Sequence, residues 1–256
     1  GGALCQRGRH GAKPTALGQL LLAEARPLLR LSREADLRLM RASAGLTGRL
    51  DIGFGISTLI AAPALLAGFR AAVPDCEITL DDMSSREQHE RLLAGWLDVG
   101  FCRAPEADDL SFAPVLTEHL ALVVPQGTAL PPPDRLDNLN ALGFVALASR
   151  RGPGLDAQVA AWCREAGFSP RIVQHADDIL TVHAVVAAGL GAALLPWHGV
   201  EALGAGTRHM RLSGPNASWP VGLSWRTADS NPLLRRFVEH VRGAAPAISP
   251  PRGNAL

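Results

Sequence analysis

Hydroxyl and basic side chains follow three apolar, strand-like segments in the first half of this chain. Ser57 and Thr58 follow the first segment, Ser84 and Ser85 the second, and Arg103 the third. In an open α/β sheet, ligands bind where the carboxyl ends of strands lead into helix N-termini, whose free N–H groups favour a negative charge. These residues therefore predict a binding site for a carboxylate or another small anion.

A second group of candidates follows strand-like segments further along the chain. Its members are Ser149, Arg150, His175, Pro196 and Trp197. Arg150 could supply positive charge, and Trp197 could contact an aromatic or apolar ligand. Every candidate also has an ordinary structural interpretation, since a hydroxyl can cap a helix, an arginine or histidine can simply be solvated or hydrogen-bonded, and a tryptophan can form a wall. The functional interpretation rests on the convergence of both groups at one edge of a sheet.

No catalytic or metal-binding motif accompanies these candidates. The sequence contains no GxSxG, HExxH or GxxxxGK[ST] motif, and its four widely spaced cysteines form no CxxC pair. The acidic pairs Asp81–Asp82 and Asp177–Asp178 end a strand and begin a helix, which are ordinary positions for carboxylates. We therefore expect a binding protein without catalytic residues, metal or cofactor. The absence of a long apolar run and of a secretory signal at the start predicts a cytoplasmic location.

The candidates lie on two similar successions of predicted strands and helices. The first has strands at 49–55, 77–81 and 97–102, with helices at 59–72 and after Ser85. A further strand at 120–124 leads into a proline-rich boundary at 125–133. The second has strands at 143–148, 171–175 and 192–195, helices at 153–166 and 177–188, and then strands at 208–212 and 221–225 and a helix at 232–242. This order predicts two α/β lobes with parallel sheets and right-handed crossovers, and a chain end that returns to the first lobe.

A long amphipathic helix is expected at 15–44, ahead of the first lobe. Thr15 can cap its start, Gly45 can end it, and Pro27 should kink it or split it in two. Its apolar stripe consists of Leu17, Leu21, Leu28, Leu31 and Ala35. Because this stripe has no partner of its own, a dimer interface is a better interpretation than an isolated helix.

Charge is unevenly distributed along the chain. The net charge is +1, but residues 1–49 contain nine basic and three acidic side chains. A basic N-terminal arm on a mildly acidic body is typical of a protein that binds nucleic acid, although it is also compatible with a solvated, arginine-rich helix.

Several segments resemble the LysR-type transcriptional regulators. Those that resemble the effector domain of this family are LTGRLDIGFGIST (46–58), LDDMSSREQHERLLAGWLDVGFCRAP (80–105) and AGFSPRIVQHADDILTVHAVVAAGLGAALLP (166–196). The segment LCQRGRHGAKPTALGQLLLAEARPLLRLSREA (4–35) is similar to the end of the family's winged helix-turn-helix and its linker helix. The resemblance covers about residues 4–242.

This resemblance implies an α/β fold with two Rossmann-like lobes of the type II periplasmic-binding-protein architecture. A wing remnant at 1–14 and a linker helix at 15–46 would precede an effector-binding domain at 47–245. Lobe I would comprise about 47–124 and 215–245, lobe II about 125–214, and residues 246–256 would be a disordered tail. The implied function is transcription regulation by a homodimer or tetramer that senses a small metabolite, for which the residues favour a carboxylic acid.

The resemblance also implies roles for individual residues. Ser57, Thr58, Ser84, Ser85 and Arg103 would line the effector cleft from lobe I, and Ser149, His175 and Pro196 from lobe II. Arg7, Arg9 and Lys13 would lie on the wing and contact DNA phosphates.

The chain departs from the family pattern at its start. Family members begin earlier, with the helix-turn-helix that reads the major groove. As written, this chain is therefore predicted not to bind an operator specifically, and a footprint on one promoter site at physiological salt would contradict that expectation. Pro14 and Pro27 also stand at positions where the family continues with other residues.

Two other classes of protein share the two-lobed architecture. A type II solute-binding protein for a small anion would have no DNA function and no reason for the basic, leucine-striped helix. A small-molecule enzyme of the same fold would need catalytic residues that the sequence does not offer.

Overall fold

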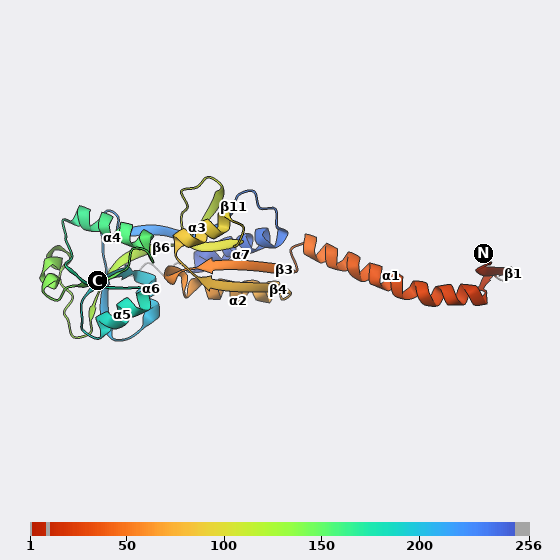
Figure 1. The fold of residues 1–256 in the computed structure, drawn as a ribbon, viewed down its shortest axis with the longest axis horizontal. Coiled ribbons are helices and arrows are strands. Elements are labelled where there is room, and N and C mark those ends of the chain that lie inside the picture. The colour runs from red at the N-terminus through yellow and green to blue at the C-terminus, as the bar shows by residue number, and fades with distance from the viewer. Residues whose placement is uncertain (1, 9–10, 249–256) are drawn as a thin grey trace.

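The computed structural model describes residues 2–8 and 11–248, and it shows two α/β lobes that follow a long N-terminal helix (Figure 1). A short antiparallel hairpin of β1 (Cys5–Gly8) and β2 (Gly11–Pro14) precedes that helix. Within the described residues, no helix has both the length and the apolar character needed to cross a lipid bilayer.

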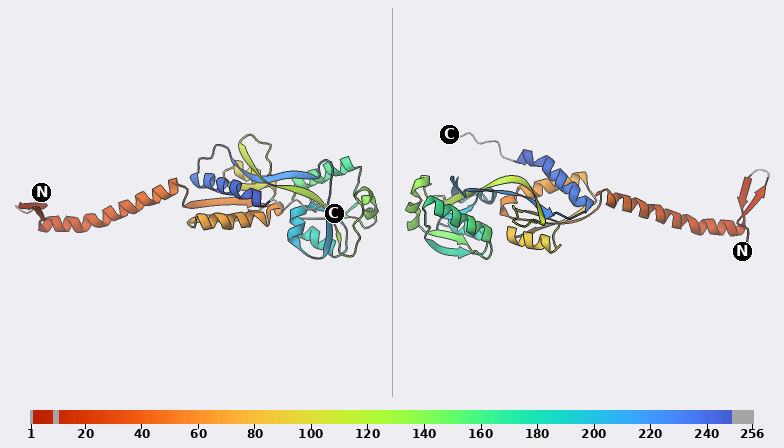
Figure 2. Two further views of the ribbon diagram at one scale, coloured as in Figure 1. Left: turned by 180° about the vertical axis from the view of Figure 1, so that it is seen from behind. Right: turned by 90° about the horizontal axis from the view of Figure 1, so that it is seen from above.

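Helix α1 (Ala16–Ser43) is one continuous element that projects away from the lobes in every view (Figure 2). The Thr15 side chain accepts a hydrogen bond from the Gly18 backbone N–H, as expected for an N-cap. Pro27 lies inside the helix without splitting it, and the helix curves along its length (Figure 1). The helix tolerates this proline because almost all of α1 is exposed, so water can hydrogen-bond to the carbonyl group that loses its intrahelical partner.

Lobe I is built on three parallel strands, as predicted. Strand β3 (Gly48–Phe54) lies between β4 (Cys76–Asp82) and β5 (Val99–Arg103), and β11 (Ser218–Arg226) adds antiparallel to β5. The short helix η1 (Ile56–Thr58) and the helices α2 (Ala61–Ala72), α3 (Ser85–Leu93) and α7 (Pro232–Ile248) complete the lobe. Its core includes the edge-to-face pair of Phe69 on α2 and Phe237 on α7, with ring centroids 5.0 Å apart.

Two glycines let α3 lie directly on the sheet. A Cβ atom at Gly53 would lie 3.0 Å from Cγ of the buried Gln88, and one at Gly100 would lie 2.8 Å from its Oε1. The Gln88 amide in turn donates to the Met83 carbonyl oxygen. This close packing fixes the first turn of α3, and therefore Ser84 and Ser85, relative to the strand ends.

Strand β6 (Leu110–Pro125) joins the lobes and is much longer than the strand predicted at 120–124. Residues 110–119 pair with β11, whereas residues 120–125 lie between β9 (Ala193–Pro196) and β10 (Thr207–Arg211). The pairing therefore changes partner near His119, and one strand carries the sheet from lobe I into lobe II.

Lobe II contains further strands and helices around a second core. The elements are η2 (Pro133–Ala141), β7 (Phe144–Leu147), α4 (Pro153–Ala166), β8 (Ile172–Ala176), α5 (Ile179–Ala187) and α6 (Trp197–Leu203). Strands β7 and β8 are parallel, but β9 and β10 are both antiparallel to β6. The sheets are therefore mixed rather than purely parallel, because β6 and β11 cross between the lobes in opposite directions. Helix α7 continues beyond the predicted end at 242 and into the segment predicted as a tail, whose residues 249–256 lie outside the described part of the chain.

Candidate functional site

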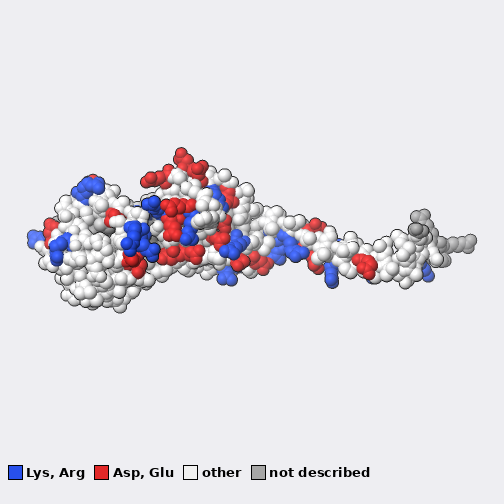
Figure 3. All heavy atoms as spheres, in the orientation of Figure 1, with Lys and Arg blue, Asp and Glu red and all other residues white. Residues whose placement is uncertain are grey.

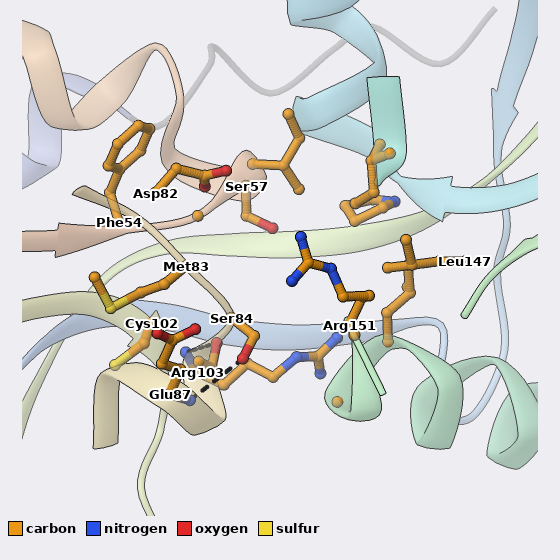
Figure 4. Close-up of a pocket in the computed structure, with 18 of the residues that line it drawn as sticks. Phe54, Ser57, Asp82, Met83, Ser84, Glu87, Cys102, Arg103, Leu147 and Arg151 are labelled. Carbon is orange, nitrogen blue, oxygen red and sulfur yellow. Dashed lines mark hydrogen bonds between the residues drawn. The ribbon is translucent and has the colours of Figure 1, made fainter. Parts of the chain in front are cut away.

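A cleft of about 400 Å³ lies between the two lobes (Figure 4). Its walls are largely apolar, with Phe54, Ile56 and Met83 from lobe I, and Leu147 and Leu155 from lobe II. Ligand sites of small-molecule binding proteins are clefts of this size, in which a few polar groups fix the orientation of the ligand. The polar groups that line this cleft are therefore the candidates for recognition.

Four of the predicted lobe I residues line the cleft: Ser57, Ser84, Ser85 and Arg103. Ser84 caps α3, since its Oγ accepts a hydrogen bond from the Glu87 backbone N–H at 3.2 Å. The Ser85 Oγ accepts from the backbone N–H of Arg103 at 3.1 Å. Ser84 is thus both a helix cap and a cleft residue, and the hydroxyl groups of Ser84 and Ser85 can still donate to a ligand.

Arg103 connects the two lobes. Its Nη1 donates to Oε1 of Gln158 on α4 at 2.8 Å, and its guanidinium lies 3.9 Å from the centre of the Trp219 ring. Burial lowers the pKa of Arg103 to about 10, and the nearby carboxylate of Glu118 opposes that shift. Arg103 therefore contributes positive charge to the cleft, but its side chain is already hydrogen-bonded and stacked.

Thr58 does not line the cleft, in contrast to its predicted place. Its side chain is fully buried and donates to the Gly55 carbonyl oxygen at 3.0 Å. The turn of η1 directs Ser57 outward and Thr58 inward, so only one of the two adjacent hydroxyls reaches the cleft.

Pro196 is the only predicted lobe II residue that lines the cleft. Ser149 and Arg150 point to other partners: the Ser149 hydroxyl donates to Asp156, and Arg150 forms an exposed ion pair with Asp177 at 2.6 Å. The tight turn after β7 places these two side chains on the outer surface.

His175 and Trp197 also lie outside the cleft. His175 is exposed on the edge strand β8. Trp197 begins α6, and its ring packs against His209, with ring centroids 4.9 Å apart, and under the Arg211 guanidinium at 4.4 Å. The start of a helix at Trp197, which the sequence did not predict, turns the ring toward β10 and away from the cleft.

Six charged residues that were not among the predicted site residues line the cleft, and Arg151 and Asp82 are among those that have no ion-pair partner in the described part of the chain. Arg151 extends into the cleft from lobe II, and Figure 4 shows its guanidinium pointing toward Ser57. Its Nε donates to the Asp177 carbonyl oxygen at 3.2 Å. Asp82 lies at the end of β4 on the lobe I side, where desolvation, and then the charge of Glu87, raise the pKa of its carboxyl group. The adjacent pairs Arg150–Arg151 and Asp81–Asp82 are the sequence features that could have indicated these two cleft residues. The sequence does not show which member of each pair faces the cleft.

The structure gives no test of the predicted phosphate contacts. Lys13 is exposed on β2, and Arg7 lies on β1. The side chain of Arg7 and the whole of Arg9 lie outside the described part of the chain. Their contact with DNA remains a prediction.

Acidic side chains lie on both lobes, and Cys102 and Cys163 are among the cysteines buried in the described part of the chain. No three His, Cys, Asp or Glu side chains there lie close enough to hold a metal ion. Burial raises the pKa of Cys102 to about 12 and that of Cys163 to about 11. These thiols therefore stay protonated and weakly nucleophilic at neutral pH.

Comparisons with known proteins agree with this architecture. The family model described as LysR substrate binding domain matches residues 43–246. The HTH-type transcriptional regulator TcbR of Pseudomonas sp. (strain P51) is 29% identical over 96% of this chain and 85% of its own length. The regulator TfdS of Cupriavidus pinatubonensis (strain JMP 134 / LMG 1197) is 31% identical over 93% of this chain and 82% of its own length.

A solved structure gives the same result in three dimensions. The crystal structure of full-length CbnR complexed with its target DNA has a TM-score of 0.74 and 28% sequence identity, and the match covers 95% of this chain and 84% of CbnR. The relatives are transcriptional regulators rather than enzymes, and the two-lobed body has the type II periplasmic-binding-protein architecture. The chain therefore belongs to the LysR family of transcriptional regulators, and residues 43–246 are its effector-binding domain.

Proposed function

We propose that the interlobe cleft binds a small carboxylic acid and that this binding changes how the regulator engages DNA. The observation that carries the proposal is the position of the Arg151 guanidinium, which extends into an apolar-walled cleft opposite the Ser57 hydroxyl (Figure 4). An arginine beside hydroxyl donors is the arrangement that binds carboxylates through charge-assisted hydrogen bonds.

The location of the cleft explains how the ligand would act. Arg151 belongs to lobe II and Ser57 to lobe I, so an acid held by both residues makes contacts that exist only when the lobes are close together. A ligand shifts a conformational equilibrium by its difference in affinity for the two states. The closed arrangement would therefore gain population in proportion to the occupancy of the cleft.

Helix α1 would connect this change to DNA through a second copy of the chain. Its leucines are exposed, with Leu28 at 67% and Leu31 at 57%, and Gly18 is its only buried residue. Apolar side chains exposed along a helix at this spacing are typical of a helix–helix interface. Light scattering on the wild-type chain should show at least a dimer. The double variant Leu28→Glu/Leu31→Glu should be monomeric, whereas the control variant Arg33→Glu should keep the wild-type mass. A monomeric wild-type chain would contradict this assignment.

A thermal-shift screen of small carboxylic acids tests the proposal directly. Free ligand at about 100 times its dissociation constant should stabilise the folded state by about 2.7 kcal/mol. Arg151→Ala should weaken binding by at least about tenfold, because it removes a charge-assisted contact worth more than ~1.4 kcal/mol. Arg164→Ala, which removes an exposed arginine from α4 outside the cleft, is the matched control. A screen of aromatic and aliphatic acids without any shift would exclude the carboxylate ligand.

A further inference from the structure

Most polar groups that line the cleft already have partners within the protein. Arg86 is paired with Glu90, Glu87 with Arg91, and Asp177 with Arg150. The carboxylate of Asp178 caps α5 by accepting from the Thr181 N–H at 2.7 Å. Part of the hydrogen-bonding capacity of each of these groups is therefore directed to the protein rather than to a ligand.

Three of the cleft groups that lack such partners among the described residues lie on the two sides of the cleft shown in Figure 4. They are the Ser57 hydroxyl, the two terminal nitrogens of Arg151, and the carboxylate of Asp82. The first two can donate hydrogen bonds to an anion. The third can only accept hydrogen bonds in its ionised form, and no cation of the described residues lies within ion-pair distance of it.

The Asp82 carboxylate is an unfavourable neighbour for a simple anionic ligand. It stands at the lobe I side of the cleft, opposite the lobe II residue Arg151 (Figure 4). Desolvation and the charge of Glu87 raise the pKa of Asp82. A ligand that placed a second carboxylate there would add like-charge repulsion, whereas an ammonium or hydroxyl group would provide the missing donor.

We infer that the effector carries a hydrogen-bond donor, an ammonium or hydroxyl group, that binds Asp82 while its carboxylate binds Arg151 and Ser57. This inference rests on the proposed function of the cleft and names the ligand class more narrowly. The ligand is an amino acid or a hydroxy acid, and neither an unsubstituted acid nor a dicarboxylic acid satisfies all three groups. Because Asp82 and Arg151 belong to different lobes, the bifunctional ligand also links the lobes at its two ends.

Binding measurements on the full 256-residue chain can test the ligand class. The probes are straight-chain acids of several lengths, each as the unsubstituted acid, the ω-amino acid, the ω-hydroxy acid and the dicarboxylic acid. Isothermal titration should show that the best donor-bearing acid binds at least about tenfold more tightly than its unsubstituted and dicarboxylic counterparts, since a site built to accept a hydrogen bond discriminates against a ligand that lacks the donor.

Variants of the two adjacent aspartates assign the preference to one side chain. Asp82→Ala should abolish the preference for donor-bearing acids, whereas Asp81→Ala, which changes the charge equally but does not line the cleft, should retain it. Asp82→Asn separates the two donors: the amide oxygen still accepts from a hydroxyl, but it no longer attracts an ammonium group. Circular dichroism melts would confirm that each variant is folded.

The outcomes distinguish the two levels of the proposal. If unsubstituted or dicarboxylic acids bind the wild type as tightly as donor-bearing acids, or if Asp82→Ala leaves the preference unchanged, the inference about Asp82 is wrong while the carboxylate site stands. If no acid of any class binds, both are wrong. If amines without a carboxylate bind as tightly as the amino acids, Asp82 is the main determinant and the carboxylate function is wrong.

Discussion

The two sides of the cleft differ in how firmly their polar side chains are held. On the lobe I side, Ser84 and Ser85 accept backbone hydrogen bonds, and Arg103 is fixed between Gln158 and Trp219. On the lobe II side, Arg151 is exposed and is held only through its Nε. The difference indicates that lobe I provides a preorganised surface, whereas lobe II provides a cation that can adjust to the ligand.

The distribution of charge shows a second difference between the lobes. Acidic side chains gather, among some basic ones, on the visible face of lobe I, whereas the charged side chains on the visible face of lobe II are fewer and mostly basic (Figure 3). An anion that enters the cleft therefore leaves the acidic face of lobe I and meets positive charge on the cleft arginines, among them Arg151 and the anchored Arg103.

The largest difference in stability between the two sides of the cleft should appear when Arg103 and Arg151 are replaced in turn. Arg103→Ala should lower the free energy of unfolding by about 2 kcal/mol, since the lost hydrogen bond and ring contact outweigh the relief of a buried charge. Arg151→Ala should change it by less than about 0.5 kcal/mol, as is usual for an exposed side chain. Urea unfolding followed by circular dichroism measures both. Equal losses in the two variants would remove the distinction between an anchored and an adaptable side.

The sequence predicted lobe I better than lobe II for a physical reason. In lobe I, β3 and β4 lead almost directly into η1 and α3, and Arg103 ends β5, so residues at the ends of these parallel strands reach the cleft. In lobe II, the chain makes a tight turn after β7, and only the conformation of that turn decides that Arg151 faces inward and Arg150 outward. Periodicity predicts that a turn exists but not the direction of each side chain in it.

The prediction of helices and strands was limited in the same way, because a local pattern does not show how distant segments pair. The helix at 153–166 was predicted with the bounds that α4 has, because its pattern is local. The first half of β6 was not predicted, since it forms a strand by pairing with β11, about a hundred residues later in the chain. The sequence thus indicated two lobes and their order, whereas the strand that joins them depends on contacts between distant segments.

A smaller effect is expected from the two cleft serines of lobe I. Ser84→Ala removes the N-cap of α3 and should cost about 1 kcal/mol of stability. Ser57→Ala should be nearly neutral for stability, because among the described residues its hydroxyl has no partner to lose, but it should weaken binding of a carboxylic acid. Chemical denaturation and titration of the same two proteins measure both quantities. A destabilised Ser57→Ala variant would show that this hydroxyl has a structural role and is not free for the ligand.

The smallest effect concerns one histidine in each lobe, the half-buried His89 of lobe I and the buried His183 of lobe II. Burial lowers the pKa of both His89 and His183 below the ordinary value of 6.5, so the unfolded chain takes up protons before the folded one as the pH falls. The stability that neutral histidine provides is therefore complete above about pH 6.5 and is lost as the pH falls through the lower pKa of the folded state. Asp82, whose pKa is raised, acts in the opposite direction, so each histidine variant must be compared with the wild type at the same pH.

His183 of lobe II should contribute more to the loss of stability at low pH than His89 of lobe I. His183 is only 7% exposed and contacts the neutral Thr207 hydroxyl at 3.1 Å, and the charge of His209 lowers its pKa further. His89 instead lies 3.1 Å from the Arg103 carbonyl oxygen, a contact that favours the protonated ring and offsets part of the burial. Denaturant unfolding at pH 7.5 and pH 5.5 should therefore show a smaller loss of stability on acidification for His183→Gln than for His89→Gln. The reverse order would place the more acid-sensitive packing in lobe I, on the side of the cleft that hydrogen bonds hold most firmly.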